Sequence, residues 1–154
     1  MILTFLLSAI LAQAPTAYVD KYANVNGLRL HYLDWGSPEK PAMILLHGIA
    51  RHAHTFDHLA PHFARNFHVL AIDMRGHGDS DWDPEGDYLV EDHVKDLEDL
   101  VAQLRLQRIT LIGNSTGGRV AQVFAGLHPN LVAQPQLLGG FLRPCPAALA
   151  WAGN

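Results

Sequence analysis

The stretch of sequence that decides the fold is ITLIGNSTGG, residues 109–118. Its first four residues are typical of a buried strand, and an apolar helical pattern begins after Ser115, which Gly113 and Gly117 frame as G-x-S-x-G. A sharp strand-to-helix turn of this kind exposes a serine hydroxyl, and glycines relieve the crowding that the turn creates. The following helix points free N–H groups at the turn, where they stabilise a developing oxyanion. The pattern predicts a serine nucleophile at position 115.

Two other interpretations of the same residues stay open. One is a glycine-rich connection between a strand and a helix that carries no chemistry. The other is a phosphate-binding P-loop, because Gly113 and Gly118 have the spacing G-x-x-x-x-G. A P-loop continues with lysine and a serine or threonine, whereas this chain has Arg119 and Val120. A nucleotide-binding P-loop protein is therefore a distant alternative.

The sequence around this turn predicts an α/β fold. Nearly continuous apolar runs indicate strands that are buried on both faces, and they occupy residues 42–46, 68–72 and 109–112. Residues 19–26 and 28–35 predict a hairpin around the Asn26–Gly27 turn. Because parallel strands need crossover connections, we expect a mostly parallel sheet with helices on both faces and an N-terminal hairpin.

Three segments between or after the strands predict helices. Residues 90–104 carry an apolar stripe at helical spacing, residues 116–127 have one apolar side, and residues 55–65 form a weaker candidate that Pro61 interrupts. The first helix also carries an acidic cluster: Glu91, Asp92, Asp96, Glu98 and Asp99. We interpret the cluster as a solvated face, with a cation site as the alternative.

Composition and charge limit the classes of protein. The chain has 154 residues, 49% of them hydrophobic and 17% charged, with a net charge of −4, which favours a compact domain and argues against nucleic acid as a partner. Residues 1–17 are read as an apolar extension or a signal-like segment, because residues 1–14 are almost wholly apolar and end in Ala-Gln-Ala. The chain is expected to be cytoplasmic, or exported if residues 1–14 act as a signal. That run is too short to span a membrane. The single cysteine, Cys145, allows no internal disulfide.

Three sequence blocks resemble the α/β-hydrolase family over residues 18–132: LHGI at 46–49, DMRGHGDS at 73–80 and GNSTGG at 113–118. Each follows a predicted strand. The resemblance implies that Ser115 is the nucleophile and that the backbone N–H groups of Ile49 and Thr116 form the oxyanion hole. His47, Gly48, Gly113 and Gly117 would support the loops, and residues 73–80 would be a structural loop beside the pocket. No cofactor or metal is expected.

The serine places the chain in the serine-nucleophile branch, since epoxide hydrolases and haloalkane dehalogenases of this family carry an aspartate at the same turn. The implied substrate is a small ester-like molecule, and the implied intermediate is an acyl-enzyme on Ser115. A separate metal site on His54, His58 and His62 is disfavoured, because Pro61 disturbs the helix that would align these side chains.

The other members of the catalytic triad are missing from this sequence. In this family the serine is followed by an Asp or Glu and then by a histidine, yet no Asp or Glu follows Ser115. His128 is the one later histidine, and helix geometry places it about 20 Å from the serine. We therefore expect weak activity or none from this chain. The alternative is a non-catalytic fragment that acts only through protein contacts.

The sequence also predicts an incomplete fold that lacks the C-terminal strands of the family. Residues 133–154 are read as a Pro/Gly-rich tail without family-like sequence, from truncation or a frameshift. Residues 109–112 would then form a bare apolar strand edge through which the chain could self-associate.

Overall fold

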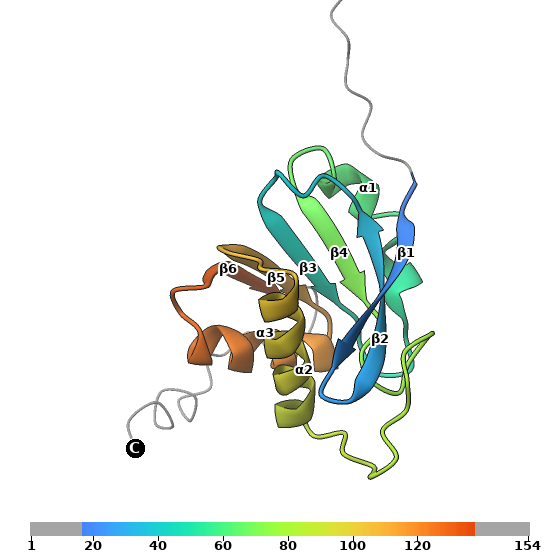
Figure 1. Ribbon diagram of the computed structural model, residues 1–154. Coiled ribbons are helices and arrows are strands. Elements are labelled where there is room, and N and C mark those ends of the chain that lie inside the picture. Colours follow the sequence, from blue (N-terminus) through green and yellow to red (C-terminus); the bar gives the residue numbers. More distant parts are fainter. Residues whose placement is uncertain (1–16, 138–154) are drawn as a thin grey trace, which may run out of the picture.

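The computed structural model of the chain describes residues 17–137 (Figure 1), which form one six-stranded sheet with the strand order β1-β2-β4-β3-β5-β6. The signal-like run at residues 1–14 and the tail beyond residue 137, with Cys145, lie outside the described residues. The strands are β1 (Val19–Val25), β2 (Leu28–Trp35), β3 (Ala42–Leu46), β4 (His68–Ile72), β5 (Ile109–Gly113) and β6 (Val132–Leu137).

The strand directions confirm the predicted mostly parallel sheet with an N-terminal hairpin. The β1–β2 hairpin turns at Asn26 and Gly27, both of which have positive φ, and β2 pairs antiparallel with β4. Strand β3 lies between β4 and β5 and is parallel to both. The carboxyl ends of these three parallel strands therefore meet at the same edge of the sheet.

Each face of the sheet has its own apolar core. Side chains alternate along β3, so that Ile44 and Leu46 belong to one cluster while Met43 and Leu45 belong to the other. Two long helices, α2 (Val90–Gln103) and α3 (Thr116–Leu127), cover the first face (Figure 1). The second face is covered by a 3₁₀ helix, η1 (Ala53–Phe56), and a short helix, α1 (Ala60–Phe63). The prediction of helices on both faces is confirmed.

The predicted helix at residues 55–65 is wrong as one element. The structure divides this region into η1 and α1, and Pro61 lies in the first turn of α1. Proline lacks the N–H that a helix interior needs, so it is accepted at the start of a helix and not in its middle.

The predicted bare edge at β5 is also wrong. Strand β6 pairs in parallel with β5 from Ile109 to Gly113 and forms the edge of the sheet in its place. Strand pairing therefore continues past Val132, where the tail was expected to begin. Pro135, between two glutamines, hides the strand in the sequence, and an edge strand is where a sheet tolerates proline. Within residues 17–137, none of the helices has the length and apolar character needed to cross a bilayer.

Candidate active site

Ser115 lies between β5 and α3 in a backbone conformation that side chains rarely adopt. Its φ is 50° and its ψ is −114°, and conformations of this kind cost about 1–3 kcal/mol. The residue is exposed although it follows a strand that is buried on both faces. The structure thus places Ser115 at the sharp strand-to-helix turn that the sequence predicted.

The glycines around the turn are required by close backbone contacts. A Cβ atom at Gly113 would lie 2.4 Å from the carbonyl oxygen of Gly117, and one at Gly117 would lie 2.3 Å from the carbonyl oxygen of Leu46. The N–H of Gly117 donates to the carbonyl oxygen of His47 at 3.0 Å. The start of α3 therefore packs directly on the end of β3, and no larger residue fits at either position.

The loop after β3 approaches the serine closely. A Cβ atom at Gly48 would lie 3.2 Å from the Cβ of Ser115. The next residue is Ile49, whose side chain is 72% exposed. The structure therefore brings together two of the loops that the sequence singled out, the one at residues 46–49 and the one at residues 113–118.

His47 fixes the direction of the peptide bond between Gly48 and Ile49. Its Nδ1 lies 2.8 Å from the carbonyl oxygen of Gly48, and the N–H of Arg51 donates to the same oxygen at 3.2 Å. In a trans peptide the C=O and the N–H point in opposite directions. Because the Gly48 oxygen points toward His47 and Arg51, the N–H of Ile49 points away from them.

The hydrogen bonds of His47 determine which ring nitrogen carries the proton. The N–H of Met74 donates to Nε2 at 3.1 Å, so Nε2 is the acceptor and the proton resides on Nδ1. Burial, which penalises the charged ring, lowers the pKa of His47 from 6.5 to about 4. A neutral, fully buried ring therefore joins the loops after β3 and β4, and its low pKa makes it unsuited as a base.

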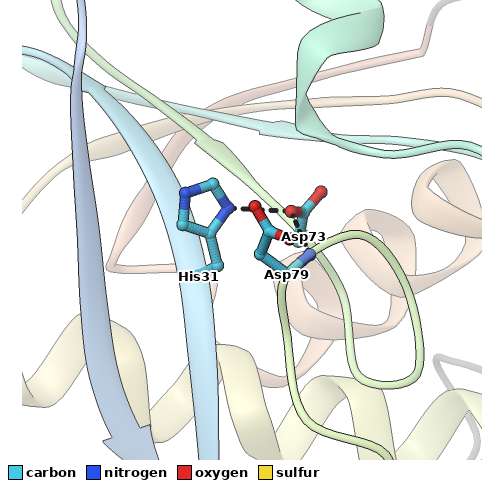
Figure 2. A group of neighbouring side chains, drawn as sticks. All are labelled: His31, Asp73 and Asp79. Carbon is cyan, nitrogen blue, oxygen red and sulfur yellow. Dashed lines mark hydrogen bonds and ion pairs between the residues drawn. The ribbon is translucent and has the colours of Figure 1, made fainter.

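The loop at residues 73–80 folds around the carboxylate of Asp73 (Figure 2). The N–H groups of Ala53 and Asp79 donate to this carboxylate at 2.5 and 3.0 Å, and His31 Nδ1 lies 2.8 Å from it. Gly78 has a φ of +53°, and a Cβ atom there would lie 2.1 Å from Asp73 Oδ2. The glycine is therefore required for the loop to close over the carboxylate.

The pKa of Asp73 reflects these contacts. Burial alone would raise it, but the backbone donors of Asp79 and Ala53, together with His31, lower it below the ordinary value. The carboxylate is thus ionised and structural, as the sequence interpretation of residues 73–80 expected. His31 was not singled out by the sequence, because a lone histidine in a strand gives no signal of a buried carboxylate partner.

His31, Asp73 and Asp79 also present ligand atoms within 4.8 Å of one another, which raises the question of a metal site. The two ring nitrogens of His31 already face Asp73 and Asp20, at 2.8 and 3.1 Å. An ion would have to displace these contacts as well as the backbone donors of Asp73. The hydrogen-bond network therefore accounts for the cluster, and these residues do not fit a metal site.

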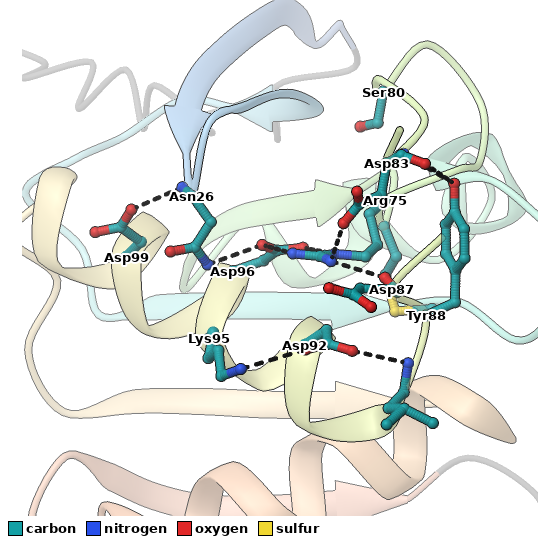
Figure 3. A network of polar contacts seen from close by, with 12 residues as sticks. Asn26, Arg75, Ser80, Asp83, Asp87, Tyr88, Asp92, Lys95, Asp96 and Asp99 are labelled. Carbon is teal, nitrogen blue, oxygen red and sulfur yellow. Dashed lines mark hydrogen bonds and ion pairs between the residues drawn. The ribbon is translucent and has the colours of Figure 1, made fainter. Parts of the chain in front are cut away.

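Arg75 anchors the rest of the loop to α2 (Figure 3). Its guanidinium is buried and forms a two-pronged pair with Asp96 at 2.6 Å for each contact. It also donates to the carboxylate of Asp83 and to the carbonyl oxygen of Asp87, both at 2.8 Å. Hydrogen bonding to Asp96 raises the pKa of Arg75, so the cation is permanent.

This pairing corrects the interpretation of the acidic cluster on α2. Asp96 is only 3% exposed, and Asn26 at the hairpin turn donates to it at 3.0 Å. Asp99 accepts the backbone N–H of Asn26 at 3.0 Å. The cluster therefore ties α2 to its neighbours and is not simply a solvated face. Helical spacing alone does not reveal this role, since a carboxylate that pairs with an arginine has the same spacing as one that faces water.

The described residues bring no acid–base pair to Ser115. His128 lies at the C-terminal end of α3 and its Nε2 is 2.6 Å from Glu98, at the far end of the helix that Ser115 begins. No hydrogen bond in residues 17–137 joins the Ser115 hydroxyl to a histidine. His54, His58 and His62 are distributed over η1, α1 and the segment between them, and His54 Nδ1 contacts Asp57 at 3.0 Å.

Comparison with known proteins identifies the family. A model described as "alpha/beta hydrolase fold" matches residues 41–154, a range that runs past Val132 through the predicted tail. The chain is 35% identical to epoxide hydrolase 3 of Xenopus tropicalis over 108 residues, 70% of this chain and 29% of the relative. It is 37% identical to a serine hydrolase-like protein of Danio rerio over 111 residues, 70% of this chain and 34% of the relative.

Solved structures agree with this assignment. An α/β hydrolase from Novosphingobium aromaticivorans superposes with a TM-score of 0.72 at 37% identity, covering 78% of this chain and 43% of that protein. The chain thus spans about a third of the curated relatives and less than half of the solved structure. The family match, the mixed sheet and the arrangement of its loops lead to one conclusion: the chain belongs to the α/β-hydrolase fold family.

Proposed function

We propose that Ser115 is the nucleophile of a hydrolase that cleaves ester-like bonds in small molecules. The observation that carries the proposal is the backbone of Ser115, with φ at 50° and ψ at −114°, held between Gly113 and Gly117. Strained backbone conformations reduce stability and cluster at functional sites, so the strain at an exposed serine supports a functional role for its hydroxyl.

The proposed reaction proceeds in two displacements. The Ser115 Oγ attacks the carbonyl carbon of the ester while its proton passes to a base, and the carbonyl oxygen becomes an oxyanion between the N–H groups of Ile49 and Thr116. The alkoxide leaves with a proton, and water then hydrolyses the acyl group from Ser115. One oxyanion donor typically contributes about 10²–10³-fold in rate.

Residues 17–137 place no base within hydrogen-bond reach of Ser115. His47 is neutral and uses both ring nitrogens, and His128 is held by Glu98. We therefore propose that these residues alone are weakly active or inactive, because a serine without its base and acid loses most of its rate advantage. A non-catalytic part that acts through protein contacts is the rival proposal.

Epoxide hydrolysis is a second candidate, because several relatives carry that name. The chemistry of Ser115 argues against it. A hydroxyl that opens an epoxide becomes an ether, which water does not release at neutral pH, whereas an aspartate would form an ester that water can hydrolyse. The Danio rerio relative named serine hydrolase-like fits the residue at 115 better.

A fluorophosphonate probe with added imidazole tests the proposal. Imidazole supplies the missing base, so we expect slow labelling of the 154-residue chain that rises with imidazole concentration. The Ser115→Ala variant should lose this labelling, whereas the matched variant Ser37→Ala, in the loop before β3, should keep it.

Two results would decide against the proposal. Equal labelling of Ser115→Ala would show that the probe reacts elsewhere, and no labelling at any imidazole concentration would show that the hydroxyl is not activated. As a second measurement, Ser115→Cys in a Cys145→Ser background should react faster with iodoacetamide when folded than when unfolded in urea, because the helix N-terminus lowers the pKa of a thiol.

A further inference from the structure

We propose that the loop at residues 82–89 is a docking surface for a basic peptide segment of another protein. The loop connects the Asp73–Ser80 turn to α2 and presents apolar side chains to solvent. Trp82 is 73% exposed and Leu89 is 69% exposed. The inference concerns a surface outside the proposed active site and does not depend on the chemistry of Ser115.

The loop is built to hold one conformation. The guanidinium of Arg75 donates to the Asp83 carboxylate and to the Asp87 carbonyl oxygen, both at 2.8 Å (Figure 3). The N–H of Asp83 donates to the hydroxyl of Tyr88 at 2.8 Å. A Cβ atom at Gly76 would lie 2.6 Å from the Tyr88 ring, so this ring packs on the glycine.

The carboxyl end of the loop is fixed as well. The N–H of Leu89 donates to the Asp92 carboxylate at 3.1 Å, and Lys95 contacts the same carboxylate at 3.3 Å (Figure 3). Trp82 lies edge-to-face with Tyr88, with ring centroids 6.4 Å apart. Trp82 therefore packs on a side chain that is itself held in place. Binding of a ligand over Trp82 then loses little conformational entropy, because the loop is already ordered.

The charge of the loop selects the partner. Glu85 and Asp87 are exposed, and neither carboxylate has a salt-bridge partner in the described part of the chain. Arg75 is buried and already paired with Asp83 and Asp96, so it cannot neutralise the outer surface. An indole ring attracts cations over its face. A lysine or arginine next to an apolar residue therefore complements Trp82 and its acidic surroundings.

The same charges disfavour two other occupants. An anionic membrane surface would be repelled by the carboxylates. A second copy of this chain would have to bring a basic patch, whereas the chain as a whole has a net charge of −4. The basic peptide is the occupant that complements both the apolar and the acidic character of the loop.

Fluorescence anisotropy of a labelled 14-residue peptide of alternating lysine and leucine tests the inference. We expect Trp82→Ala to weaken binding about five- to tenfold, and Glu85→Gln with Asp87→Asn to weaken it and reduce its salt dependence. The matched control, Glu39→Gln with Asp57→Asn, removes the same charge elsewhere and should change binding less than twofold. Circular dichroism should show that all variants stay folded.

Three outcomes would overturn the inference. Equal weakening by the two charge variants, with no effect of Trp82→Ala, would mean that the peptide senses only net charge. A Trp82-dependent shift of fluorescence on anionic or zwitterionic vesicles, without peptide binding, would assign the surface to a membrane. If size exclusion shows a dimer, and Trp82→Ala converts it to a monomer, the surface would be assigned to a second copy of the chain.

Discussion

The turn that carries Ser115 and the loop that Arg75 anchors lie at the same edge of the sheet, but different forces hold them. The Ser115 turn is held by backbone contacts so close that Gly113 and Gly117 must lack side chains. The Arg75 loop is held by ionised side chains, with Asp96 and Asp83 on a buried guanidinium. The Ser115 turn is therefore sensitive to substitutions that add atoms, and the Arg75 loop is sensitive to substitutions that change a charge.

This difference suits the two regions to different tasks. Backbone packing leaves Ser115 little freedom to move, because a carbonyl oxygen cannot give way as a side chain can. Ion pairing leaves the surface of the Arg75 loop free to vary in sequence. The difference also predicts which substitutions will damage each region.

Arg75→Met should be the most damaging change. It leaves Asp96 buried without its cation, and breaking a buried pair from one side typically costs about 3–5 kcal/mol. Urea unfolding followed by circular dichroism measures the loss.

The double variant Arg75→Met with Asp96→Leu is the matched control for that experiment. Because it removes the carboxylate as well, it should be more stable than Arg75→Met by at least about 1 kcal/mol. A double variant no more stable than the single one would show that the buried charge is not the cause.

Acid should destabilise the turn through His47. The folded-state pKa is depressed from 6.5 to about 4, so the neutral ring stabilises the fold fully above pH 6.5, and this contribution is lost progressively as the pH falls from 6.5 to 4. A shift of this size corresponds to about 3 kcal/mol. Urea unfolding at pH 7 and at pH 4.5 measures the change.

Two variants isolate His47 from the other groups that titrate in this range. His47→Gln should reduce the dependence of stability on pH, whereas His62→Gln, at an exposed position, should leave it as it is. An unchanged dependence in His47→Gln would mean that the buried ring does not cause the loss.

Ser115→Gly should stabilise the protein slightly while it removes the hydroxyl. Glycine adopts a positive φ without strain, so we expect a gain of about 1 kcal/mol in the free energy of unfolding. Ser115→Ala keeps a Cβ atom at the same φ and should show no such gain. If both variants are equally stable, the turn does not store strain at this residue.

The sequence predicts most of the fold because its signals are local. The Asn26–Gly27 pair marks the hairpin, and the strands at 42–46 and 68–72 end where the apolar runs end. The turn at Ser115 is equally local, since two glycines frame it. These elements could be found without knowing what packs on them.

Tertiary partners are the part that the sequence does not reveal. Asp96 has the spacing of a solvated residue and becomes buried only because Arg75, on another loop, reaches it. His31 gives no signal of Asp73, which directly follows the neighbouring strand β4. Strand β6 was missed because Pro135 breaks its pattern, and only its pairing with β5 shows that it is a strand.

The place of β3 in the sheet has a consequence for synthesis. The strands that flank β3 are β4 and β5, and both follow it in the chain. When β3 has just been synthesised, this wholly apolar segment therefore has no strand to pair with. The N-terminal hairpin also lacks its partner in the sheet, because β2 pairs with β4. Such non-local pairing slows folding and exposes the growing chain to aggregation. The same central position that sets the end of β3 against Ser115 leaves one side of β3 unpaired on the growing chain until β5 has been synthesised.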